Sequence, residues 1–417
     1  MAETNVTIYN LVSLAGLFGL MATAWAVSRN RRNVNWRLIV WATVLQLAFG
    51  LFVFQSPVGR DALWAAGQTI VRLIALGNEG VEFVFGNLAI SPPDRRSLGF
   101  FLIFQGFPVI IFFSAFMALL YYLRILPAVV RAFAWVFART MRVSGAEALY
   151  TAGQIFTGVE SATAIRPYLL KMTDSELHAL MTAGLSTVAT NILALYVAYL
   201  TGVVEDAAGH LMAASVLGAP AALVAAKLVW PEDGRPETMG HVPPVHTAGH
   251  SSATDAVING AMDGVRLIVG IVALLIAFLG LLAVANSLLG WLANVQLETL
   301  LGYAFRPFAL MMGVPWDDAD KVAELLGTRT IATEVVSYNR LAAWTRDGLI
   351  GPRAALISVY ALCGFAHVAS VAIYIGGTAA LVPERRKDLA KVAWRALLAG
   401  TIASMMTGAV AGVCYTG

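Results

Sequence analysis

The sequence predicts an all-α integral membrane protein, and three observations lead to this fold class. Of the 417 residues, 59% are hydrophobic and only 13% are charged, about half the charged share of a soluble domain. The apolar runs are long enough to cross a hydrocarbon layer as helices, which takes about 20 residues. Too few segments alternate between polar and apolar residues for a membrane β-barrel, so we expect a bundle of helices.

Eight segments have the length and composition of membrane spans. They cover residues 6–27, 37–54, 99–123, 179–201, 209–230, 264–288, 354–376 and 394–415. We interpret the first as a span rather than a signal peptide, because it is full length and follows the acidic start MAETN. Segment 58–76 carries Arg60, Asp61 and Arg72 among apolar residues, which predicts a helix lying in the membrane interface.

Basic loops predict the orientation and the division of the chain. SRNRRNVNWR follows the first span and PERRKDLAK precedes the last, so by the positive-inside rule both loops are cytoplasmic and both termini lie outside. The acidic VEDAAGH, after the fourth span, then lies outside as well. We expect N-terminal helices in 1–98, a first repeat in 99–230, a cytoplasmic linker in 231–263 and a second repeat in 264–417.

The two halves share an interrupted polar segment followed by a span with polar residues at its centre. SGAEALYTAGQIFTGVESATAIRPYLL contains Glu160, which precedes Asn191 by 31 residues. LLGTRTIATEVVSYNRLAAW contains Glu334, which precedes His367 by 33 residues. Broken segments and ionisable groups are tolerated at membrane depth only inside protein or beside a wet cavity. Their recurrence in both halves indicates the binding site of a transporter.

Each of these side chains also has a purely structural explanation, which stays open. Glu160 and Glu334 would then lie in loops outside the membrane. Asn191 would join two helices through a hydrogen bond. His367 would be a hydrogen-bonded core histidine, with Ser370 one turn away on the same face.

Other function classes find less support. His241, His246 and His250 lie in a loop rich in proline and glycine, which does not favour a metal site. Cys363 and Cys414 lie in apolar segments without a partner motif, so no disulfide framework is expected. The sequence has neither an HExxH motif nor a GxSxG elbow, which disfavours a membrane enzyme. A passive channel or a solute sensor remains an alternative, and the net charge of +3 does not indicate a nucleic-acid partner.

Long ordered stretches of the chain resemble the concentrative nucleoside transporters. These stretches are FQGFPVIIFFSAFMALLYYLRIL, SGAEAL, IFTGVE with IRPYLLKMTDSEL, and YALCGFAHVASVAIYIGGTAALVPERRKDLA. The resemblance implies about eight spans, an interfacial helix, an inverted repeat and two re-entrant hairpins near 145–170 and 323–345. It also implies a homotrimer in the lipid of a bacterial inner membrane. Each protomer would import nucleosides by ion-coupled alternating access, in which a transport domain moves against a scaffold domain.

The resemblance implies a solute site with several departures from the family pattern. The implied solute-binding residues are Gly158, Val159, Glu160, Ser161, Thr163, Glu334, His367 and Ser370. Relatives read Gly-Gln-Thr/Ser-Glu-Ala-Pro in the first hairpin, whereas Gly158 is followed by Val159 and Glu160, so the base-recognising glutamine is missing. His367 stands in place of an asparagine, while Glu334 keeps the ribose-binding carboxylate. Changed hydrogen-bonding groups imply a changed substrate selectivity. The alternative to a nucleoside substrate is a nucleobase, a modified nucleoside or another polar metabolite.

The resemblance implies ion coupling at a second group of residues. Gln154 and Asn191 stand where sodium-coupled relatives have an asparagine and a serine, with carbonyl oxygens expected from Thr157, Asn191 and Ile192. Oxygen ligands suit a hard cation such as sodium. Proton coupling through a hairpin glutamate or His367 is the competing hypothesis, because histidine and buried carboxylates titrate near neutral pH. No cofactor is expected apart from the coupling ion.

Overall fold

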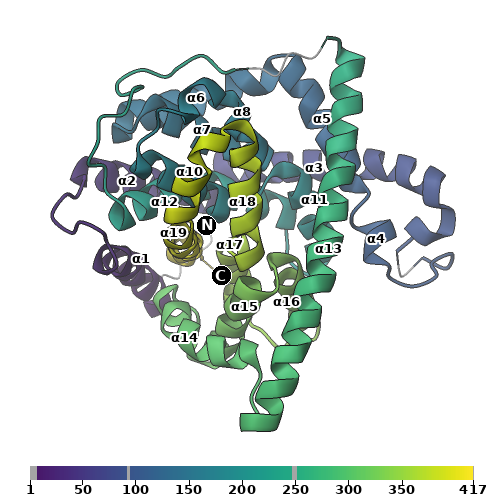
Figure 1. Ribbon diagram of the computed structural model, residues 1–417. Coiled ribbons are helices and arrows are strands. Elements are labelled where there is room, and N and C mark those ends of the chain that lie inside the picture. The colour runs from purple at the N-terminus through teal and green to yellow at the C-terminus, as the bar shows by residue number, and fades with distance from the viewer. Residues whose placement is uncertain (1–6, 92–93, 247–250, 417) are drawn as a thin grey trace.

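The computed structural model describes residues 7–91, 94–246 and 251–416, and its regular elements in these ranges are helices (Figure 1). The first half contains α1 (Ile8–Ala26), α2 (Trp36–Gln55), α3 (Pro57–Phe85), η1 (Gly86–Ala89), α4 (Leu102–Gln105), α5 (Val109–Tyr122), α6 (Ile125–Met141), α7 (Gly145–Thr157), η2 (Gly158–Glu160), α8 (Ser161–Ala164), α9 (Arg166–Leu169), α10 (Asp174–Ser186), α11 (Thr190–Leu200) and α12 (Ala207–Val229). The second half contains α13 (Ala253–Ala293), α14 (Leu297–Met311), η3 (Trp316–Asp318), α15 (Ala319–Ile331), α16 (Glu334–Arg346), α17 (Pro352–Leu362), α18 (Val368–Leu381), η4 (Pro383–Arg385) and α19 (Arg386–Cys414).

Seven segments of the described chain are long and apolar enough to cross a membrane. They are Ile8–Ala26, Trp36–Gln55, Leu102–Tyr122, Asp174–Leu200, Ala207–Val229, Ala253–Ala293 and Pro383–Cys414. The eighth predicted span, 354–376, is covered by α17 and α18, which are shorter apolar helices. The prediction of an all-α membrane protein with about eight spans is therefore confirmed.

Helix boundaries differ from prediction in three places. The predicted interfacial helix 58–76 is the first part of α3, which starts behind the N-cap Ser56 and continues to Phe85. α13 begins at Ala253, capped by Ser252, so the connection after α12 ends before residue 253 rather than at 263. The polar residues in the first turns of α13 made this part resemble a linker. α6 and α14 were not predicted, because each is amphipathic and too short for a span.

Two helical hairpins lie at opposite ends of the molecule. α7 to α9 form the first, at the predicted 145–170, and α15 with α16 form the second, around the predicted 323–345. In Figure 1, α7 and α8 are near the top and α15 and α16 near the bottom. Each hairpin is followed by a helix with a central break, α10–α11 at 187–189 and α17–α18 at 363–367. The same order of elements thus occurs in both halves, as an inverted repeat requires.

The two broken helices touch at their breaks. Thr187 and Ala189 have extended backbone, so α10 ends at Ser186 and α11 begins at Thr190. Gly364 lies against this break, and a Cβ atom there would stand 2.9 Å from the carbonyl carbon and oxygen of Ser186. Only glycine permits so close an approach. The contact brings the ends of four half-helices together inside the bundle.

Segments predicted to share a side of the membrane lie together. The Asn33 side chain donates a hydrogen bond to the Glu232 carbonyl (2.7 Å), and Arg385 donates to the Leu170 carbonyl (2.7 Å). All four belong to parts predicted to be cytoplasmic. At the other end α1 meets the end of α19, because the Asn10 amide donates to two carbonyl groups near the C-terminus. These contacts agree with the predicted orientation.

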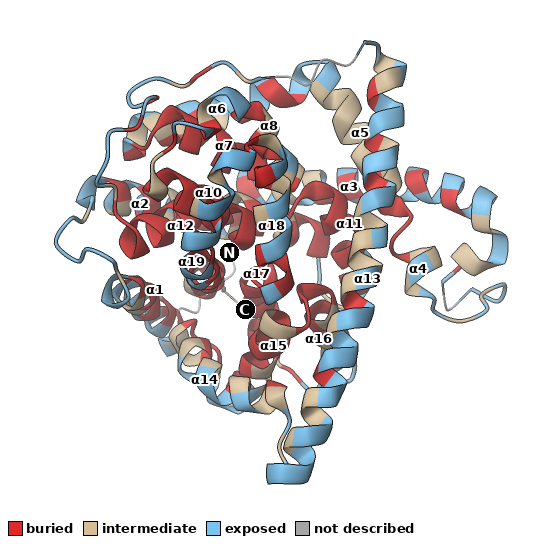
Figure 2. Cartoon of the chain, viewed as in Figure 1, coloured by how far each residue is buried: buried red, intermediate tan, exposed pale blue. Residues whose placement is uncertain are grey.

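Burial separates the core from one peripheral helix. The apolar windows of α12 and α19 are each 89% buried, whereas that of α13 is 11% buried. Figure 2 shows this contrast as a buried centre beside a long helix that is largely exposed. α13 packs against α5 and otherwise presents apolar surface, which calls for lipid or another protein surface around it.

Candidate functional site

A small cavity lies where both hairpin tips meet the broken helices. Its volume is about 70 Å³, enough for water but well below the roughly 300 Å³ of a small-molecule site. It is lined by Gly158, Val159, Glu160, Ala189, Asn191, Ile192, Leu267, Ile271, Leu274, Thr333, Glu334, Val335, Phe365, His367, Ser370, Ile373 and Tyr374. This set includes all the predicted solute-binding residues except Ser161 and Thr163, and the predicted ion ligands Asn191 and Ile192. The two halves of the chain therefore converge on one cavity.

Glu334 is a buried carboxylate at the tip of the second hairpin, and two side chains hold it. It is the first residue of α16, where the free N–H groups of a helix start favour negative charge. Tyr196 donates its hydroxyl proton to Glu334 Oε1 at 2.7 Å, and His367 Nε2 lies 3.2 Å from Oε2. The Tyr196 ring stacks on Tyr338 with centroids 4.4 Å apart. The carboxylate is therefore fixed in position by the protein itself.

His367 caps the second half of a broken helix, and this contact fixes its tautomer. Its Nδ1 accepts a hydrogen bond from the backbone N–H of Ser370 at 3.3 Å. The ring proton is therefore on Nε2, which lies 3.2 Å from Glu334 Oε2 and 2.6 Å from Ser370 Oγ. A neutral imidazole in this tautomer donates from Nε2. Histidine thus serves as both the cap and the donor at a position where the family pattern has asparagine.

A second cavity, of about 220 Å³, adjoins the first. It is lined by Ser114, Met117, Ala118, Tyr121, Phe156, Thr157, Glu160, Thr163, Asn191, Gly260 and Asp263. Gly260 and Asp263 lie near the start of α13, so this cavity extends toward the predicted cytoplasmic side. Together the two volumes approach about 300 Å³, the lower limit for small-molecule sites. The described residues that line them include three carboxylates and no lysine or arginine.

Glu160 lies between the two cavities and belongs to the lining of both. Its side chain is exposed to this space, and no other described residue forms an ion pair with it. Gly158 makes the turn before it with φ of +65°, a backbone conformation that favours glycine. A Cβ at Gly158 would also stand 3.1 Å from the Ala189 side chain and 3.2 Å from Glu160 Oε2. The hairpin tip therefore depends on glycine to present the carboxylate.

The predicted ion ligands lie close together, but their side chains are engaged with the protein. Gln154 is fully buried, and its Nε2 donates to the Gly158 carbonyl at 2.6 Å, while its Oε1 accepts from the Tyr374 hydroxyl at 3.4 Å. Asn191 Oδ1 accepts from the next backbone N–H at 2.9 Å, and its Nδ2 donates to Ser114 Oγ at 3.2 Å. The side-chain amides of both residues are therefore already hydrogen-bonded within the protein.

Ser161 and Thr163, both predicted to contact the solute, do not line the first cavity. Ser161 is 3% exposed, and its hydroxyl oxygen is 2.7 Å from that of Thr157. Because Gly153 has no side chain, Ser161 packs inside the hairpin instead of facing a solute. Thr163 and Thr157 line the second cavity. Thr157 also donates to the Gly153 carbonyl at 3.2 Å.

Three residues near the site were not predicted from sequence. Tyr374 lines the cavity four residues after Ser370, and this i, i+4 spacing was a usable signal. Thr333 directly precedes Glu334, and its buried hydroxyl has no hydrogen-bond partner among the described residues. Tyr196 gave no signal, because a tyrosine in an apolar segment is ordinary until its hydroxyl partner is known.

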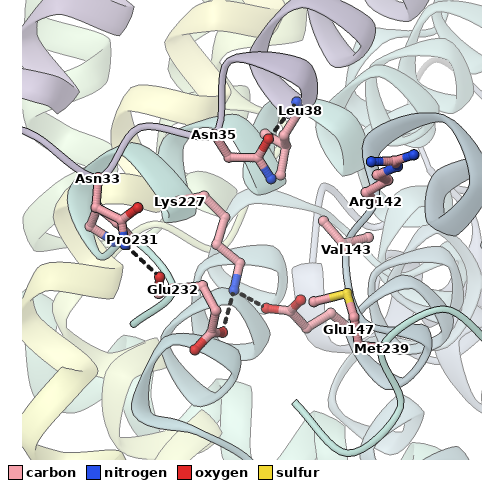
Figure 3. A pocket seen from close by; sticks show the side chains of 10 residues that line it. All are labelled: Asn33, Asn35, Leu38, Arg142, Val143, Glu147, Lys227, Pro231, Glu232 and Met239. Atoms are coloured by element: carbon pink, nitrogen blue, oxygen red, sulfur yellow. Dashed lines mark hydrogen bonds and ion pairs between the residues drawn. The ribbon is translucent and has the colours of Figure 1, made fainter. Parts of the chain in front are cut away.

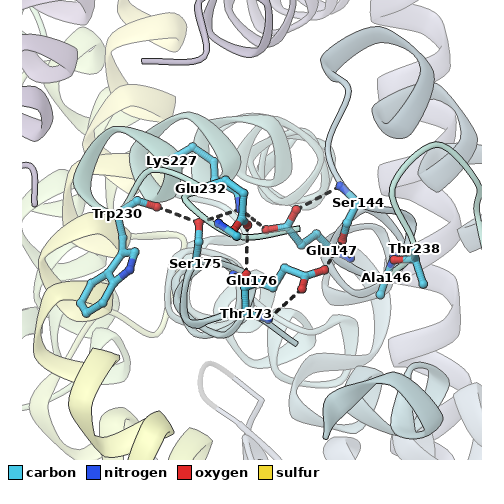
Figure 4. Close-up of polar contacts among 11 residues, drawn as sticks. Ser144, Ala146, Glu147, Thr173, Ser175, Glu176, Lys227, Trp230, Glu232 and Thr238 are labelled. Carbon is cyan, nitrogen blue, oxygen red and sulfur yellow. Dashed lines mark hydrogen bonds and ion pairs between the residues drawn. The ribbon is translucent and has the colours of Figure 1, made fainter. Parts of the chain in front are cut away.

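A buried polar cluster supports the first hairpin at its predicted cytoplasmic end. Ser144 caps α7 by accepting from the Glu147 N–H (3.2 Å), and it donates to Glu176 Oε1 of α10 (2.5 Å). Lys227 of α12 forms ion pairs with Glu147 and, at 3.2 Å, with Glu232. Figure 3 shows Lys227 between these two carboxylates beside a cavity of about 280 Å³, and Figure 4 shows the whole network. The hairpin is thus joined to α10, α12 and the linker.

The remaining histidines and cysteines form no site in the described chain. His250 lies outside the described residues, and His241 and His246 lie in the linker after α12. No group of three or more histidine, cysteine, aspartate or glutamate residues in the described ranges could hold a metal ion. Cys363 and Cys414 are buried free thiols.

Three family profiles match consecutive parts of the chain. The profile of the Na+ dependent nucleoside transporter N-terminus matches residues 15–88, and that of its C-terminus matches residues 210–412. A nucleoside recognition profile, named Gate, matches residues 103–202 between them. The matched regions contain both hairpins and both broken helices.

Several curated proteins are similar to this chain. Human solute carrier family 28 member 3 is 36% identical over 424 residues, which cover 97% of this chain and 60% of that protein. Rat sodium/nucleoside cotransporter 1 is 37% identical over 426 residues, which cover 97% of this chain and 64% of that protein. The chain therefore spans about three fifths of the length of the curated relatives it matches.

Solved structures of one further relative match over nearly the whole chain. The structure of CNTnw in an inward-facing substrate-bound state has a TM-score of 0.90 and 33% sequence identity, covering 98% of both chains. A variant of the same protein in an outward-facing state has a TM-score of 0.88 and 32% identity, again covering 98% of both. With this fold, these profiles and these relatives, the chain belongs to the concentrative nucleoside transporter family, a family of sodium-dependent transporters rather than enzymes.

Proposed function

We propose that this chain imports a nucleoside or a nucleoside-like solute by ion-coupled alternating access. The observation that carries the proposal is the Glu334 carboxylate, held by Tyr196 and His367 at a cavity that both hairpin tips reach. Hydrogen bonds to an ionised carboxylate are stronger than neutral ones, so such a group suits the paired hydroxyls of a ribose. Outward- and inward-facing structures of a relative support alternating access.

Polar atoms on one side of the cavity are suited to a sugar. Glu334 Oε2 has only the 3.2 Å contact with His367, and Thr333 Oγ1 has no hydrogen-bond partner among the described residues. Ser370 Oγ lies on the same side. A buried polar atom without a partner costs free energy, and solute hydroxyl groups would remove that cost. We therefore assign sugar binding to Glu334, His367 and Ser370, with Thr333 as an additional contact.

The apolar part of the lining is suited to a base with few hydrogen bonds. It comprises Val159, Phe365 and Ile373, together with Leu267, Ile271 and Leu274 of α13. The glutamine expected in the first hairpin is absent, and Glu160 is the polar group that remains at this tip. Because the lost amide removes a means of discrimination, the alternative substrate is a nucleobase, a modified nucleoside or another polar metabolite.

The coupling ion in this proposal is sodium or a proton, and the carboxylate-rich cavities favour a cation in either case. For sodium, the ligands would be the side-chain oxygens of Gln154 and Asn191 with the carbonyls of Thr157, Asn191 and Ile192. Gln154 would have to turn its oxygen inward and release the Gly158 carbonyl. For a proton, the acceptor would be a hairpin glutamate or His367.

We further propose a homotrimer in a bacterial inner membrane, with one pathway in each protomer. The support within this chain is α13, whose apolar window is 11% buried and which packs against α5 at the edge of the core. Such a pair can form a scaffold, with the exposed face of α13 against lipid or another copy. Crosslinking in membranes measures the number of protomers, and a monomer would contradict this part of the proposal.

Uptake by reconstituted protein tests the function. Purified protein in liposomes is given radiolabelled uridine, cytidine or adenosine, with sodium and proton gradients imposed separately. Accumulation above the external concentration with one of these gradients supports transport and identifies the ion. Equal inside and outside concentrations would instead indicate a passive channel. If no nucleoside competes with any transported solute, the alternative substrate class replaces the nucleoside.

A further inference from the structure

We infer that the chain binds one anionic phospholipid at its predicted cytoplasmic surface, with the phosphate on the arginines of α6 and one acyl chain in an adjacent apolar pocket. The inference rests on a pocket, a row of charges and their relative positions. It does not depend on the identity of the transported solute.

The pocket is almost entirely apolar and has a volume of about 270 Å³. It is lined by Ile70, Leu73, Phe113, Phe116, Met117, Leu120, Ile125, Leu126, Val129, Ile155, Phe156, Thr190, Leu193, Met212, Ser215 and Val216. Apolar cavities exclude water and accept apolar ligands. In a membrane protein, the most abundant apolar ligand is a lipid acyl chain.

Arginines form a row along the exposed side of α6. Arg131 and Arg139 lie within the helix, and Arg124 and Arg142 lie at its two ends. At 3.6 residues per turn, their positions fall within an arc of about 80°. No aspartate or glutamate occurs between residues 95 and 146, and none of the four arginines forms an ion pair with a described residue. A basic amphipathic helix of this kind attracts anionic lipid.

The arginine row and the pocket are next to each other. Ile125, Leu126 and Val129 of α6 line the pocket, and Arg124 directly precedes them. On the helix, Ile125 and Val129 lie on the flank beside the arginines, and Leu126 lies on the opposite, buried face. Trp135 is 59% exposed, and Arg139 lies over its ring at 5.9 Å, as is typical of a membrane interface. A phosphate held by Arg124 and Arg131 would therefore place its acyl chain at the pocket mouth.

The pocket adjoins the candidate site. Its lining residues come from α3, α5, α6, α7, α11 and α12. Met117 and Phe156 also line the second cavity beside the solute site. A bound acyl chain would therefore contact residues on the solute route, and we expect transport to depend on anionic lipid.

Native mass spectrometry of the purified full-length protein tests the inference. The protein is delipidated in mild detergent and titrated with phosphatidylglycerol or phosphatidylcholine. We expect one tightly bound phosphatidylglycerol per chain, and about 10- to 30-fold weaker binding after Arg124→Gln with Arg131→Gln. Val129→Trp leaves the arginines in place but fills the pocket, and should also release the lipid. Arg31→Gln with Arg32→Gln removes the same charge from exposed positions between α1 and α2, away from the pocket, and should bind lipid as the wild type does.

Three results would overturn the inference. In the first, the wild-type protein binds no phosphatidylglycerol. In the second, it binds phosphatidylglycerol and phosphatidylcholine with equal affinity. In the third, both the arginine variant and the tryptophan variant bind phosphatidylglycerol as tightly as the wild type. Gel filtration checks that each variant is folded. If the arginine variant does not fold, the tryptophan variant decides alone, since Val129 is 38% exposed and tolerates a larger side chain.

Discussion

Replacing Glu334 by glutamine perturbs the proposed sugar site where its geometry is most constrained. In the wild type both carboxylate oxygens face donors, with Tyr196 Oη 2.7 Å from Oε1 and His367 Nε2 3.2 Å from Oε2. A carboxamide has one acceptor oxygen and one NH₂ donor. If its NH₂ group faces His367 Nε2, two donors oppose each other; if it faces Tyr196, the tyrosine hydroxyl must turn and accept instead of donate. The substitution therefore removes the charge and also disturbs the fixed position.

The size of the effect follows from burial. Glu334 is 2% exposed, so solvent does little to weaken its hydrogen bonds. A hydrogen bond to a charged group contributes about 1.5–3 kcal/mol, and about 1.4 kcal/mol changes an affinity tenfold. Loss of one such bond to a solute hydroxyl weakens binding by about 10- to 150-fold. Loss of two bonds to a vicinal diol reduces uptake below detection.

The assay is initial-rate uptake in proteoliposomes together with solute binding by calorimetry in detergent. Glu334→Asp serves as the matched control, because it keeps the charge but shortens the side chain by one methylene, and it should retain part of the binding. Gel filtration separates loss of function from loss of the folded assembly. A Glu334→Gln protein with KM within threefold of wild type and an unchanged maximal rate would refute the proposed contact.

Three further substitutions test other parts of the structure. His367→Asn keeps a side chain that can cap α18, so we expect the protein to fold. We also expect ordinary nucleosides to compete better for uptake than they do in the wild type. Unchanged competition would indicate a structural histidine. Burial, together with Glu205, raises the pKa of Asp206 from 3.8 to about 6. The contribution of Asp206 to the free energy of unfolding is therefore complete below pH 3.8 and is lost as the pH rises through 6. Asp206→Asn should remove this part of the pH dependence of Tm, and a parallel Tm–pH curve would contradict it. Gly364→Ala places a Cβ 2.9 Å from Ser186 backbone atoms and should lower the free energy of unfolding by about 1–3 kcal/mol. This loss is measured as a lower Tm in detergent. An unchanged Tm would mean that the two broken helices can move apart without cost.

The membrane fold was largely predictable because hydropathy is a local property. Runs of apolar residues indicated the spans, and glycine with polar residues indicated both hairpins, whereas the breaks in the following helices were expected only as polar residues at the centre of a span. α6 and α14 escaped prediction since each is amphipathic, carries two charged residues and is shorter than a span. The start of α13 at Ala253 was missed because its first turns are polar, and only the cap at Ser252 distinguishes a helix from a linker there.

The site was predictable only where the two halves repeat. Glu160 and Glu334 stand in matching contexts, and the structure brings both to the same cavity. Side-chain direction was not predictable in the same way. Ser161 follows Glu160 directly, yet its hydroxyl turns toward Thr157 inside the hairpin. Tyr196 holds Glu334 across 138 residues of sequence, a distance over which no spacing argument applies.

The departures from the family pattern share a physical consequence. Gln154 donates to the Gly158 carbonyl at the first hairpin, and His367 contacts Glu334 and Ser370 at the second. In both places a long polar side chain spends its hydrogen-bonding capacity within the protein. The cavity is correspondingly small, about 70 Å³. A ligand must therefore replace bonds that each contribute about 0.5–1.5 kcal/mol, which favours solutes that return as many hydrogen bonds as they displace.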